Sequence, residues 1–283
     1  MKQIVSLLLL LAFPLCQAVA VEVNGGYQTT APTDSNITNW SSGWGASGIT
    51  GWDFVGNVNG ASGVYIGNGW VLTAGHVGPG NFTLQGTTYT AVNGSALTLT
   101  DTNGTADLTM FQIASAPALP LLPIATTAPT PFSNFNAGTS VVMLGFGGGQ
   151  GETWGENTVT TTNLLVQITS YGTTFNTIDF KTAFGTTTAG RSRVTNTAQF
   201  IAGDSGGGDF NYDTSSGRWK LVGINEATDA NNNAYMVDLS HYAAQINKAV
   251  PVVPDPRILA LFGITVAWLF ARKIQGGHAG AQN

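Results

Sequence analysis

The sequence predicts an all-β fold that ends in one α-helix. Short apolar or alternating runs, broken by Gly, Asn, Thr and Pro, follow one another along the chain, which is typical of short strands. No stretch in the middle of the chain sustains a helical period. The 37 glycines and the low charged fraction of 9% fit an exported β-protein better than a cytosolic enzyme. Many short strands at regular spacing favour a β-sandwich or β-barrels.

Eight runs carry the strand pattern, and one later segment carries the helical pattern. The expected strands cover residues 64–66, 70–73, 96–100, 108–113, 141–146, 164–169, 177–180 and 219–224. In the segment 239–250, apolar side chains recur at helical spacing and form one stripe, which predicts a terminal helix. The stripe consists of Leu239, Tyr242, Ala243, Ile246 and Val250.

Residues 1–20 have the pattern of a secretory signal peptide. A basic start at Lys2 precedes an apolar run, and Ala18 and Ala20 form an A-x-A-like cleavage site. The run is short for a membrane anchor, which is the alternative. Cys16 is the only cysteine and lies inside this leader, so we expect a mature protein without disulfides whose stability comes from core packing.

Residues 251–283 form a second targeting segment. A proline motif at 253–256 precedes an apolar run at 258–270, and Arg272 and Lys273 follow. As a helix this run would span about 20 Å, less than the ~30 Å of a hydrocarbon core. The arrangement resembles the PEP-CTERM type of bacterial sorting tail, which implies a membrane contact that can be transient and a sorting machinery. A simple tail anchor is the alternative, and either places the body outside the cytoplasm, in the envelope, at the cell surface or in the medium.

The charge distribution excludes a nucleic-acid binder. The formal net charge is −5, and no Lys or Arg occurs between Gln3 and Phe180. A protein that binds nucleic acid needs a basic stripe to displace counterions from phosphates. We also predict no cofactor and no metal site.

Ser205 is the candidate nucleophile. It lies in the glycine-rich stretch Gly203-Asp204-Ser205-Gly206-Gly207-Gly208, where small residues let a substrate carbonyl approach. Because a serine is a weak nucleophile alone, it needs a base and an acid that orients the base. His76 in WVLTAGHV and Asp107 in ADLTMFQI supply them, in the order His, Asp, Ser. Asp101 is the rival acid, but it lies in a turn, whereas Asp107 opens an apolar strand that can bury it.

These three motifs, WVLTAGHV, ADLTMFQI and GDSGGG, resemble those of the chymotrypsin/trypsin-like serine proteases. The resemblance extends to the strands at 221–224 and 234–237 and covers about residues 62–250. It implies two antiparallel β-barrels, residues 21–125 and 126–250, with the active site between them and a crossover at 116–132. Val77 follows His76 where animal members have a cysteine, which indicates a bacterial type.

The resemblance also implies roles for individual residues. Ser205 would attack the scissile carbonyl to form an acyl-enzyme, His76 would move the proton, and Asp107 would orient His76. The backbone N–H groups of Gly203 and Ser205 would form the oxyanion hole. At the specificity pocket the floor is the neutral Gln199, which predicts poor cleavage after Arg or Lys. The pocket walls would be Glu226, Thr228 and Asn233.

Asp204 is the residue that the resemblance connects with activation of the enzyme. In the family the equivalent aspartate pairs with a new N-terminal amine that is released by cleavage after a basic residue. The absence of Lys and Arg between Gln3 and Phe180 excludes such a cut ahead of the domain. We therefore expect Asp204 to be satisfied otherwise, for instance by Arg191 or Arg193.

Three functions remain to be weighed. The first is an exported serine endopeptidase that acts on proteins or peptides. The second is a catalytically silent surface binding module that keeps the protease fold. The third is an esterase, but the G-x-S-x-G elbow of that class is absent.

Overall fold

The first sheet contains seven strands in the order β8-β7-β4-β5-β6-β10-β9, all antiparallel. The structure is a computed structural model that describes residues 4–6, 21–23, 26–185 and 198–250. The strands are β4 (Val55–Val58), β5 (Ala61–Gly67), β6 (Trp70–Thr73), β7 (Phe82–Leu84), β8 (Thr87–Tyr89), β9 (Leu97–Asp101) and β10 (Gly104–Gln112). A bridge between Ala91 and Ile113 joins the segment after β8 to the end of β10 and closes this sheet into a barrel.

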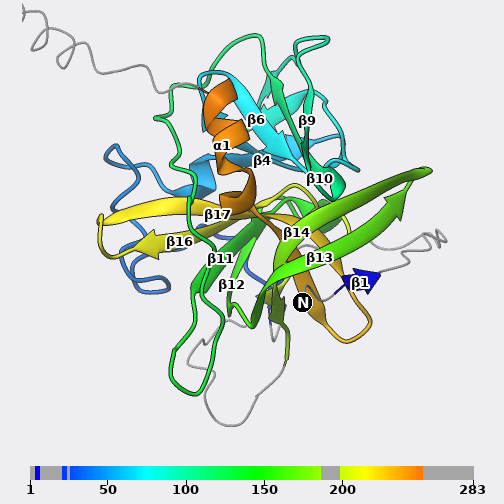
Figure 1. Cartoon of the computed structure of the whole chain (residues 1–283). Helices are drawn as coiled ribbons and strands as arrows, with labels where there is room; N and C mark the ends of the chain where they lie inside the picture. The colour runs from blue at the N-terminus through cyan, green and yellow to red at the C-terminus, as the bar shows by residue number, and fades with distance from the viewer. Residues whose placement is uncertain (1–3, 7–20, 24–25, 186–197, 251–283) are drawn as a thin grey trace, which may run out of the picture. The chain divides into compact units, whose positions relative to one another are not determined.

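The second sheet has eight strands in the order β1-β13-β14-β18-β17-β16-β11-β12 (Figure 1). They are β1 (Ile4–Ser6), β11 (Ser140–Gly145), β12 (Thr153–Thr158), β13 (Thr161–Ser170), β14 (Thr173–Ala183), β16 (Gly208–Asp213), β17 (Arg218–Thr228) and β18 (Asn233–Asp238). Among the described residues, the strand pairs of this sheet are antiparallel except for the parallel pair β1–β13. The Thr160 N–H donates to the Lys181 carbonyl, which ties the end of β12 to β14.

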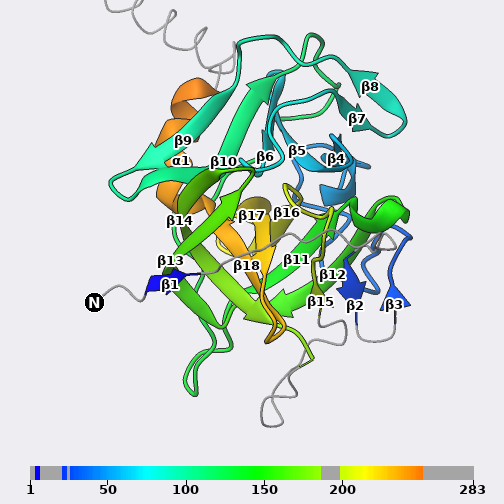
Figure 2. The same cartoon turned by 90° about the vertical axis from the view of Figure 1, so that its right-hand side faces the viewer.

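Three short strands form a small third sheet beside the second one (Figure 2). They are β2 (Glu22–Val23), β3 (Gly26–Tyr27) and β15 (Ala198–Gln199), with β15 pairing to β2. Two 3-10 turns, Gly51–Asp53 and Gly147–Gly149, complete the short elements. The sheet brings the start of the chain's body next to the segment just before Ser205.

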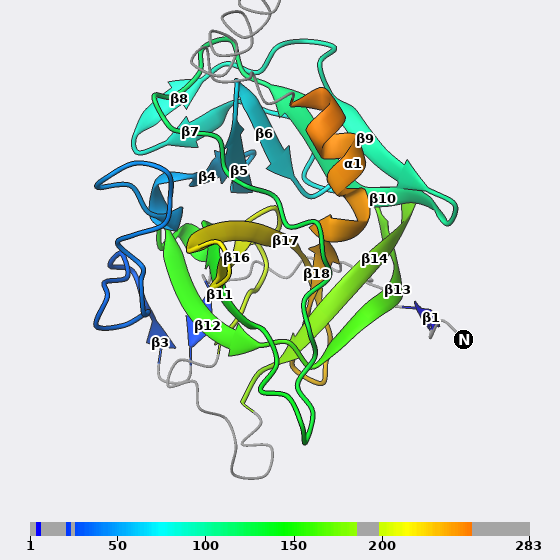
Figure 3. The ribbon, with the colours of Figure 1, turned by 60° about the vertical axis from the view of Figure 1, so that its left-hand side comes forward.

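The helix α1 (Leu239–Ala249) follows β18 directly and lies against the first sheet (Figure 3). Asp238 caps its first turn by accepting from the Ser240 N–H at 3.0 Å. Gln245 bonds the backbone of Thr100, and the His241 Nε2 lies 2.7 Å from Asp101 Oδ2. The C-terminal helix, which follows the last strand of the second sheet, is therefore attached to β9, an edge strand of the first sheet.

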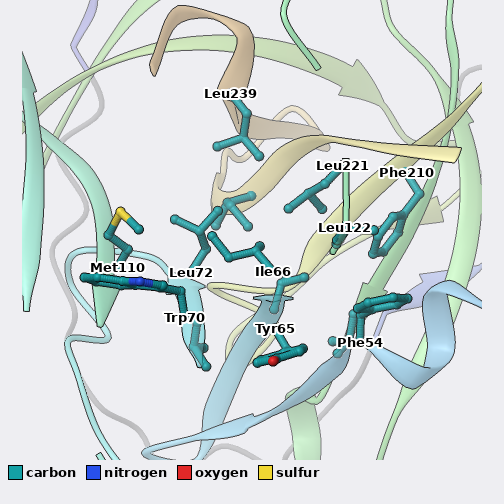
Figure 4. Close-up of a cluster of buried hydrophobic side chains, with 14 of the residues drawn as sticks. Phe54, Tyr65, Ile66, Trp70, Leu72, Met110, Leu122, Phe210, Leu221 and Leu239 are labelled. Atoms are coloured by element: carbon teal, nitrogen blue, oxygen red, sulfur yellow. The ribbon is translucent and has the colours of Figure 1, made fainter. Parts of the chain in front are cut away.

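The largest of three hydrophobic clusters among the described residues extends through both sheets and α1 (Figure 4). Leu72 and Met110 enter it from the first sheet, Phe210 and Leu221 from the second, and Leu239 from the helix. Because no cysteine occurs outside Cys16, packing of this kind carries the stability of the described body.

The all-β fold of two antiparallel barrel sheets with one C-terminal helix is confirmed, and each of the eight predicted runs contains a strand. The prediction did not include β1, β2, β3, β4, β7, β8, β12, β15 and β16, most of which are too short to show a strand pattern of their own. Among the residues that the structure describes, no helix has the length and apolar content to cross a membrane. The predicted tail at 251–283 and nearly all of the predicted leader lie outside those residues.

Candidate functional site

His76 lies just after β6 and faces Asp107 with two groups. Its backbone N–H donates to Asp107 Oδ1 at 2.6 Å, and its Nδ1 lies 2.6 Å from Asp107 Oδ2. Gly75 allows this approach, since a Cβ there would lie 2.9 Å from Asp107 Oδ1 and 3.0 Å from the Phe175 ring. The carboxylate of Asp107 thus fixes the position of both the backbone N–H and the imidazole ring of His76.

Asp107 is fully buried in β10 at an irregular point of the strand. The pairing of β10 with β9 shifts register between Thr105 and Thr109, the signature of a bulge that re-aims a side chain. The Asp107 N–H, which loses its strand partner there, donates to Thr177 Oγ1 of β14 at 2.9 Å. Asp107 is therefore held by the second sheet as well as by its own.

The environment shifts the His76 pKa upward. Burial alone would lower this pKa, but the hydrogen bond and the negative charge of Asp107 outweigh it. The side chain is 19% exposed, so part of it stays accessible to solvent. A histidine in this setting can take up a proton at neutral pH and hold it as an imidazolium.

The turn that carries Ser205 is packed against the segment that leads to His76. The Ser205 carbonyl accepts from the Ser62 N–H at 2.9 Å, and the Gly206 N–H donates to the Asn225 carbonyl at 2.9 Å. A Cβ on Gly206 would overlap the Ser62 carbonyl and the Thr73 hydroxyl, and it would lie 3.1 Å from the Ala74 nitrogen. The turn thus lies directly against residues 73–74, next to His76 in the chain.

Two backbone N–H groups in this turn are available to a ligand. Gly203 has φ +96°, a conformation that favours glycine. Within the described parts of the chain, the N–H groups of Gly203 and Ser205 donate to no acceptor. The Gly203 carbonyl is instead held by the Ser62 hydroxyl at 3.1 Å, and that hydroxyl also accepts from the Phe146 N–H at 2.8 Å.

Asp204 points away from the turn into the protein and is fully buried. Its Oδ1 accepts from the Gly147 N–H at 2.7 Å and its Oδ2 from the Ile201 N–H at 3.0 Å. Burial raises the Asp204 pKa to about 7, although the N–H groups of Ile201, Gly147 and Val21 lower it. The expected partners Arg191 and Arg193 lie outside the described residues.

Val21 was not expected at this site. Its side chain is fully buried, and its N–H donates to Thr153 Oγ1 at 2.8 Å and also points toward Asp204. The signal that could have identified it is its position, because Val21 directly follows the A-x-A-like pattern that ends at Ala20.

A second group of carboxyls lies behind Asp107. Glu226 of β17 is 3% exposed, and its Oε1 accepts from the Thr177 hydroxyl at 2.9 Å. Asp179 of β14 is fully buried beside Glu226. Sequence reasoning missed Thr177 and Asp179, because nothing in a strand pattern shows which carboxyls meet in the interior.

The four residues expected to form the specificity pocket lie in different surroundings. Gln199 in β15 is partly buried, and its Nε2 lies 3.4 Å from Glu22 Oε2. Asn233 opens β18, and its Nδ2 donates to Asp229 Oδ2 at 2.7 Å. Thr228 ends β17, paired with β18. The Glu226 side chain is the one of the four that points to the Asp107 region.

The rival acid Asp101 has a different histidine as its partner. Its Oδ2 lies 2.7 Å from His241 Nε2, and its two oxygens also accept from Asn103. This pair joins α1 to the β9–β10 turn and is partly exposed at the imidazole, 37%. Asp107 is thus the aspartate that the structure brings to His76.

Comparisons with known proteins give one family match and several similar solved structures. The family model described as Trypsin matches residues 46–250. A serine-to-alanine mutant of Rv3671c from M. tuberculosis, in an inactive form, has 16% identity over 81% of this chain and 99% of that chain, with a TM-score of 0.50. The HtrA-type protease AlgW with a decapeptide has 18% identity over 67% and 51% of the two chains, with a TM-score of 0.45.

The NS6 protease from murine norovirus 1 has 14% identity over 68% of this chain and 93% of that chain, with a TM-score of 0.44. At these identities the likeness to solved structures shows the fold alone. The search of curated proteins found no relative of this chain.

Proposed function

The chain belongs to the trypsin family of serine proteases, and from this premise we propose that it is an exported serine endopeptidase with the triad His76, Asp107 and Ser205. The observation that carries the proposal is the His76–Asp107 pair. Both carboxylate oxygens of a fully buried aspartate accept from one histidine, at 2.6 Å each. This arrangement fixes the ring tautomer with the proton on Nδ1 and leaves Nε2 free to act as a base.

The reaction follows from these positions. Ser205 Oγ attacks the scissile carbonyl of a peptide while His76 Nε2 takes its proton, and the resulting imidazolium is stabilised by Asp107. The proton then passes to the leaving amine, and the acyl-enzyme remains on Ser205. The free N–H groups of Gly203 and Ser205 support an oxyanion hole, since each such donor contributes about 3 kcal/mol to the transition state. Water then attacks the acyl-enzyme while His76 Nε2 takes its proton, the bond between Ser205 Oγ and the acyl carbon breaks, and the proton passes to Ser205 Oγ as the acid product leaves.

Active-site labelling tests this proposal. A fluorophosphonate probe should label the purified wild-type protein, whereas Ser205→Ala should give no label with an unchanged circular-dichroism spectrum. Ser215→Ala, an exposed serine whose hydroxyl bonds Asp213, is the matched control and should label fully. If intact Ser205 stays unlabelled at every pH tested between about pH 6 and 9, the silent binding module becomes the better account.

We propose that the substrate preference is not for Arg or Lys at the cleaved bond. Gln199 carries no charge, and its amide is directed to Glu22 rather than held free. A peptide-library profile of the purified protein should therefore show poor cleavage after basic residues. Efficient cleavage after Arg or Lys would contradict this and would point to the Glu22 carboxylate as the acid of the pocket.

We propose that removal of the leader after Ala20 also completes the site. Cleavage there would turn the buried Val21 N–H into an amine beside Thr153 and the buried Asp204 carboxylate. The new charge would compensate a carboxylate that, within the described chain, accepts only from uncharged backbone groups. No cut after a basic residue is needed, in line with the sequence.

Two preparations of the protein test this step. One should begin at Val21, and the other should carry a single additional alanine in front of it, so that no amine lies at Asp204. We expect the first to be at least tenfold more active, the size of effect that about 1.4 kcal/mol produces. Equal activities would contradict the role of the amine, and N-terminal sequencing of exported protein would locate the natural start.

The C-terminal tail is proposed to direct the body to the cell envelope. Its proline motif, apolar run and basic pair in 251–283 support this. Fractionation of a bacterial host should find the full chain in the envelope and a chain truncated after Val250 in the soluble exported fraction. An identical distribution of both chains would contradict a targeting role.

A further inference from the structure

We propose that Glu226 is a positioning residue for the His76–Asp107 pair, and that its carboxyl acts in the protonated form, in which it shares a proton with Asp179 and anchors Thr177 against Asp107. The inference rests on the proposed function, because it assigns a role in setting the geometry of that triad. Three strands from two sheets meet in this contact, namely β10, β14 and β17.

The Thr177 hydroxyl is the link, and its single proton sets the direction of the chain of hydrogen bonds. Thr177 Oγ1 accepts from the Asp107 N–H at 2.9 Å. It therefore donates its own proton to Glu226 Oε1, also at 2.9 Å. Glu226 Oε1 is an acceptor in this arrangement, so a proton on the Glu226 carboxyl resides on Oε2.

The Glu226–Asp179 pair must retain a proton because the remaining oxygens of the two carboxyls have neither a hydrogen-bond donor nor a cation beside them. In the described part of the chain, Glu226 Oε2 and both oxygens of Asp179 have no hydrogen-bond partner of ordinary geometry, and no Lys, Arg or His forms an ion pair with either residue. The two carboxyls lie close enough to interact directly. Two adjacent carboxylates in a buried site cannot both be ionised.

The surrounding charges also favour the protonated form of the Glu226–Asp179 pair. Asp107 on β10 and Asp238 at the end of β18 face the pair with negative charge, and the hydroxyls of Tyr235 and Tyr242 lie nearby. Burial, followed by the charge of Asp179, raises the pKa of Glu226 well above its ordinary value. Burial likewise raises the pKa of Asp179. At neutral pH the pair therefore holds a proton.

The consequence for the site is geometric. The bulge in β10 removes the strand partner of the Asp107 N–H, and the Thr177 hydroxyl replaces it. Glu226 keeps that hydroxyl in place. If this anchor is lost, Asp107 can move, and a displacement of about 1 Å in a catalytic group can cost ~10²-fold in rate.

Matched variants of the full-length protein test whether the Glu226 carboxyl that holds Thr177 is neutral or charged. Glu226→Gln keeps an acceptor for Thr177 and a donor for Asp179, so kcat and KM should stay within about threefold of wild type. Glu226→Ala removes the anchor, and kcat should fall about tenfold or more with KM little changed, since only positioning is lost. Thr177→Ser should retain activity and Thr177→Val should lose it as Glu226→Ala does.

Asp209→Asn is the control for neutralising a buried carboxyl. Asp209 is fully buried and its carboxyl oxygens have no hydrogen-bond partner within the described residues, but it faces Gly223 and Phe180 and not Asp107. Its kcat should equal that of wild type. Infrared difference spectra at neutral pH supply an independent readout, because Glu226→Gln should remove one carboxylic-acid C=O band of the wild type.

The outcomes are distinguishable from a failure of the proposed function. A wild type that neither labels nor cleaves contradicts the protease proposal. The infrared band then still tests whether the Glu226–Asp179 pair holds a proton. A wild type that cleaves, with Thr177→Val and Glu226→Ala equally active, overturns the positioning role. A Glu226→Gln variant that loses as much kcat as Glu226→Ala, or that leaves the infrared spectrum unchanged, overturns the protonated state.

Discussion

Replacing Asp107 by asparagine changes one acceptor into a donor and leaves the shape of the side chain almost the same. In the wild type, Oδ1 accepts from the His76 N–H and Oδ2 faces Nδ1, at 2.6 Å each. Asparagine has only one oxygen. If that oxygen keeps the backbone N–H, the amide NH₂ faces Nδ1 and requires a lone pair there, so the ring proton moves to Nε2.

The magnitude follows from this wrong tautomer. An Nε2 that carries a proton cannot accept the proton of Ser205, and loss of the carboxylate also removes the charge that stabilises the imidazolium. The corresponding change in a protease triad lowers kcat by about 10⁴, which is about 5 kcal/mol of transition-state stabilisation. We expect a loss of this order for Asp107→Asn, with the fluorophosphonate label slowed in proportion.

The matched control is Asp101→Asn, which changes the same chemistry at the other aspartate–histidine pair. That pair is partly exposed at His241, so its loss should cost at most about 1 kcal/mol of folding stability and leave kcat/KM essentially unchanged. The assay is initial-rate hydrolysis of a library-derived peptide, with stability followed by urea titration. An Asp107→Asn variant within tenfold of wild type, or an Asp101→Asn variant equally impaired, would refute the reasoning.

Three further predictions test other parts of the structure. Because Asp107 raises the His76 pKa above the ordinary histidine value of about 6.5, the acid limb of kcat/KM should have its midpoint above that pH. The contribution of His76 to folding stability should be present below the unfolded-state pKa and lost as pH rises through the folded-state value, and an acid limb at or below 6.5 would contradict this. Gly206→Ala should destabilise the fold by about 3 kcal/mol in urea titrations, because Gly206 has φ +85° and an added Cβ would overlap Ser62 and Thr73; a cost under about 1 kcal/mol would show that the turn can move. Trp44→Ala should cost ~3–5 kcal/mol by the same measurement, since its ring is 2% exposed and stacks on Trp219 at 5.1 Å; a small loss would mean that the aromatic cluster collapses around the cavity.

Much of the architecture was predictable because it rests on local patterns. Period-two runs between Gly, Asn and Thr breaks mark strands wherever they occur, and the stripe from Leu239 to Ile246 marks one helix. Both signals depend only on neighbours in the chain. The short strands β7 and β8 could not be identified this way, because their strand conformation depends on the pairing of β7 with β4 and of β8 with β7.

The candidate site was likewise predictable where it depends on local sequence and not where it depends on distant segments. The motifs around His76, Asp107 and Ser205 were readable because each is a compact string of residues. The preference for Asp107 over Asp101 also came from local setting, an apolar strand against a turn. The bulge that turns Asp107 toward His76, and the packing of Gly206 on Thr73, depend on pairing between distant segments.

The sequence by itself determined the fold class, and it predicted the three candidate residues and two terminal targeting segments, because these depend on short-range order and residue type. Only the tertiary structure decided the surroundings of the buried carboxyls. Burial and the identity of neighbours set the state of a carboxyl, and no local pattern reports either. Glu226, which the sequence assigned to a pocket wall, lies with Thr177 and Asp179 beside Asp107. Asp204 meets Val21, 183 positions earlier in the chain, and that contact connects the serine turn to the point where the leader is expected to end.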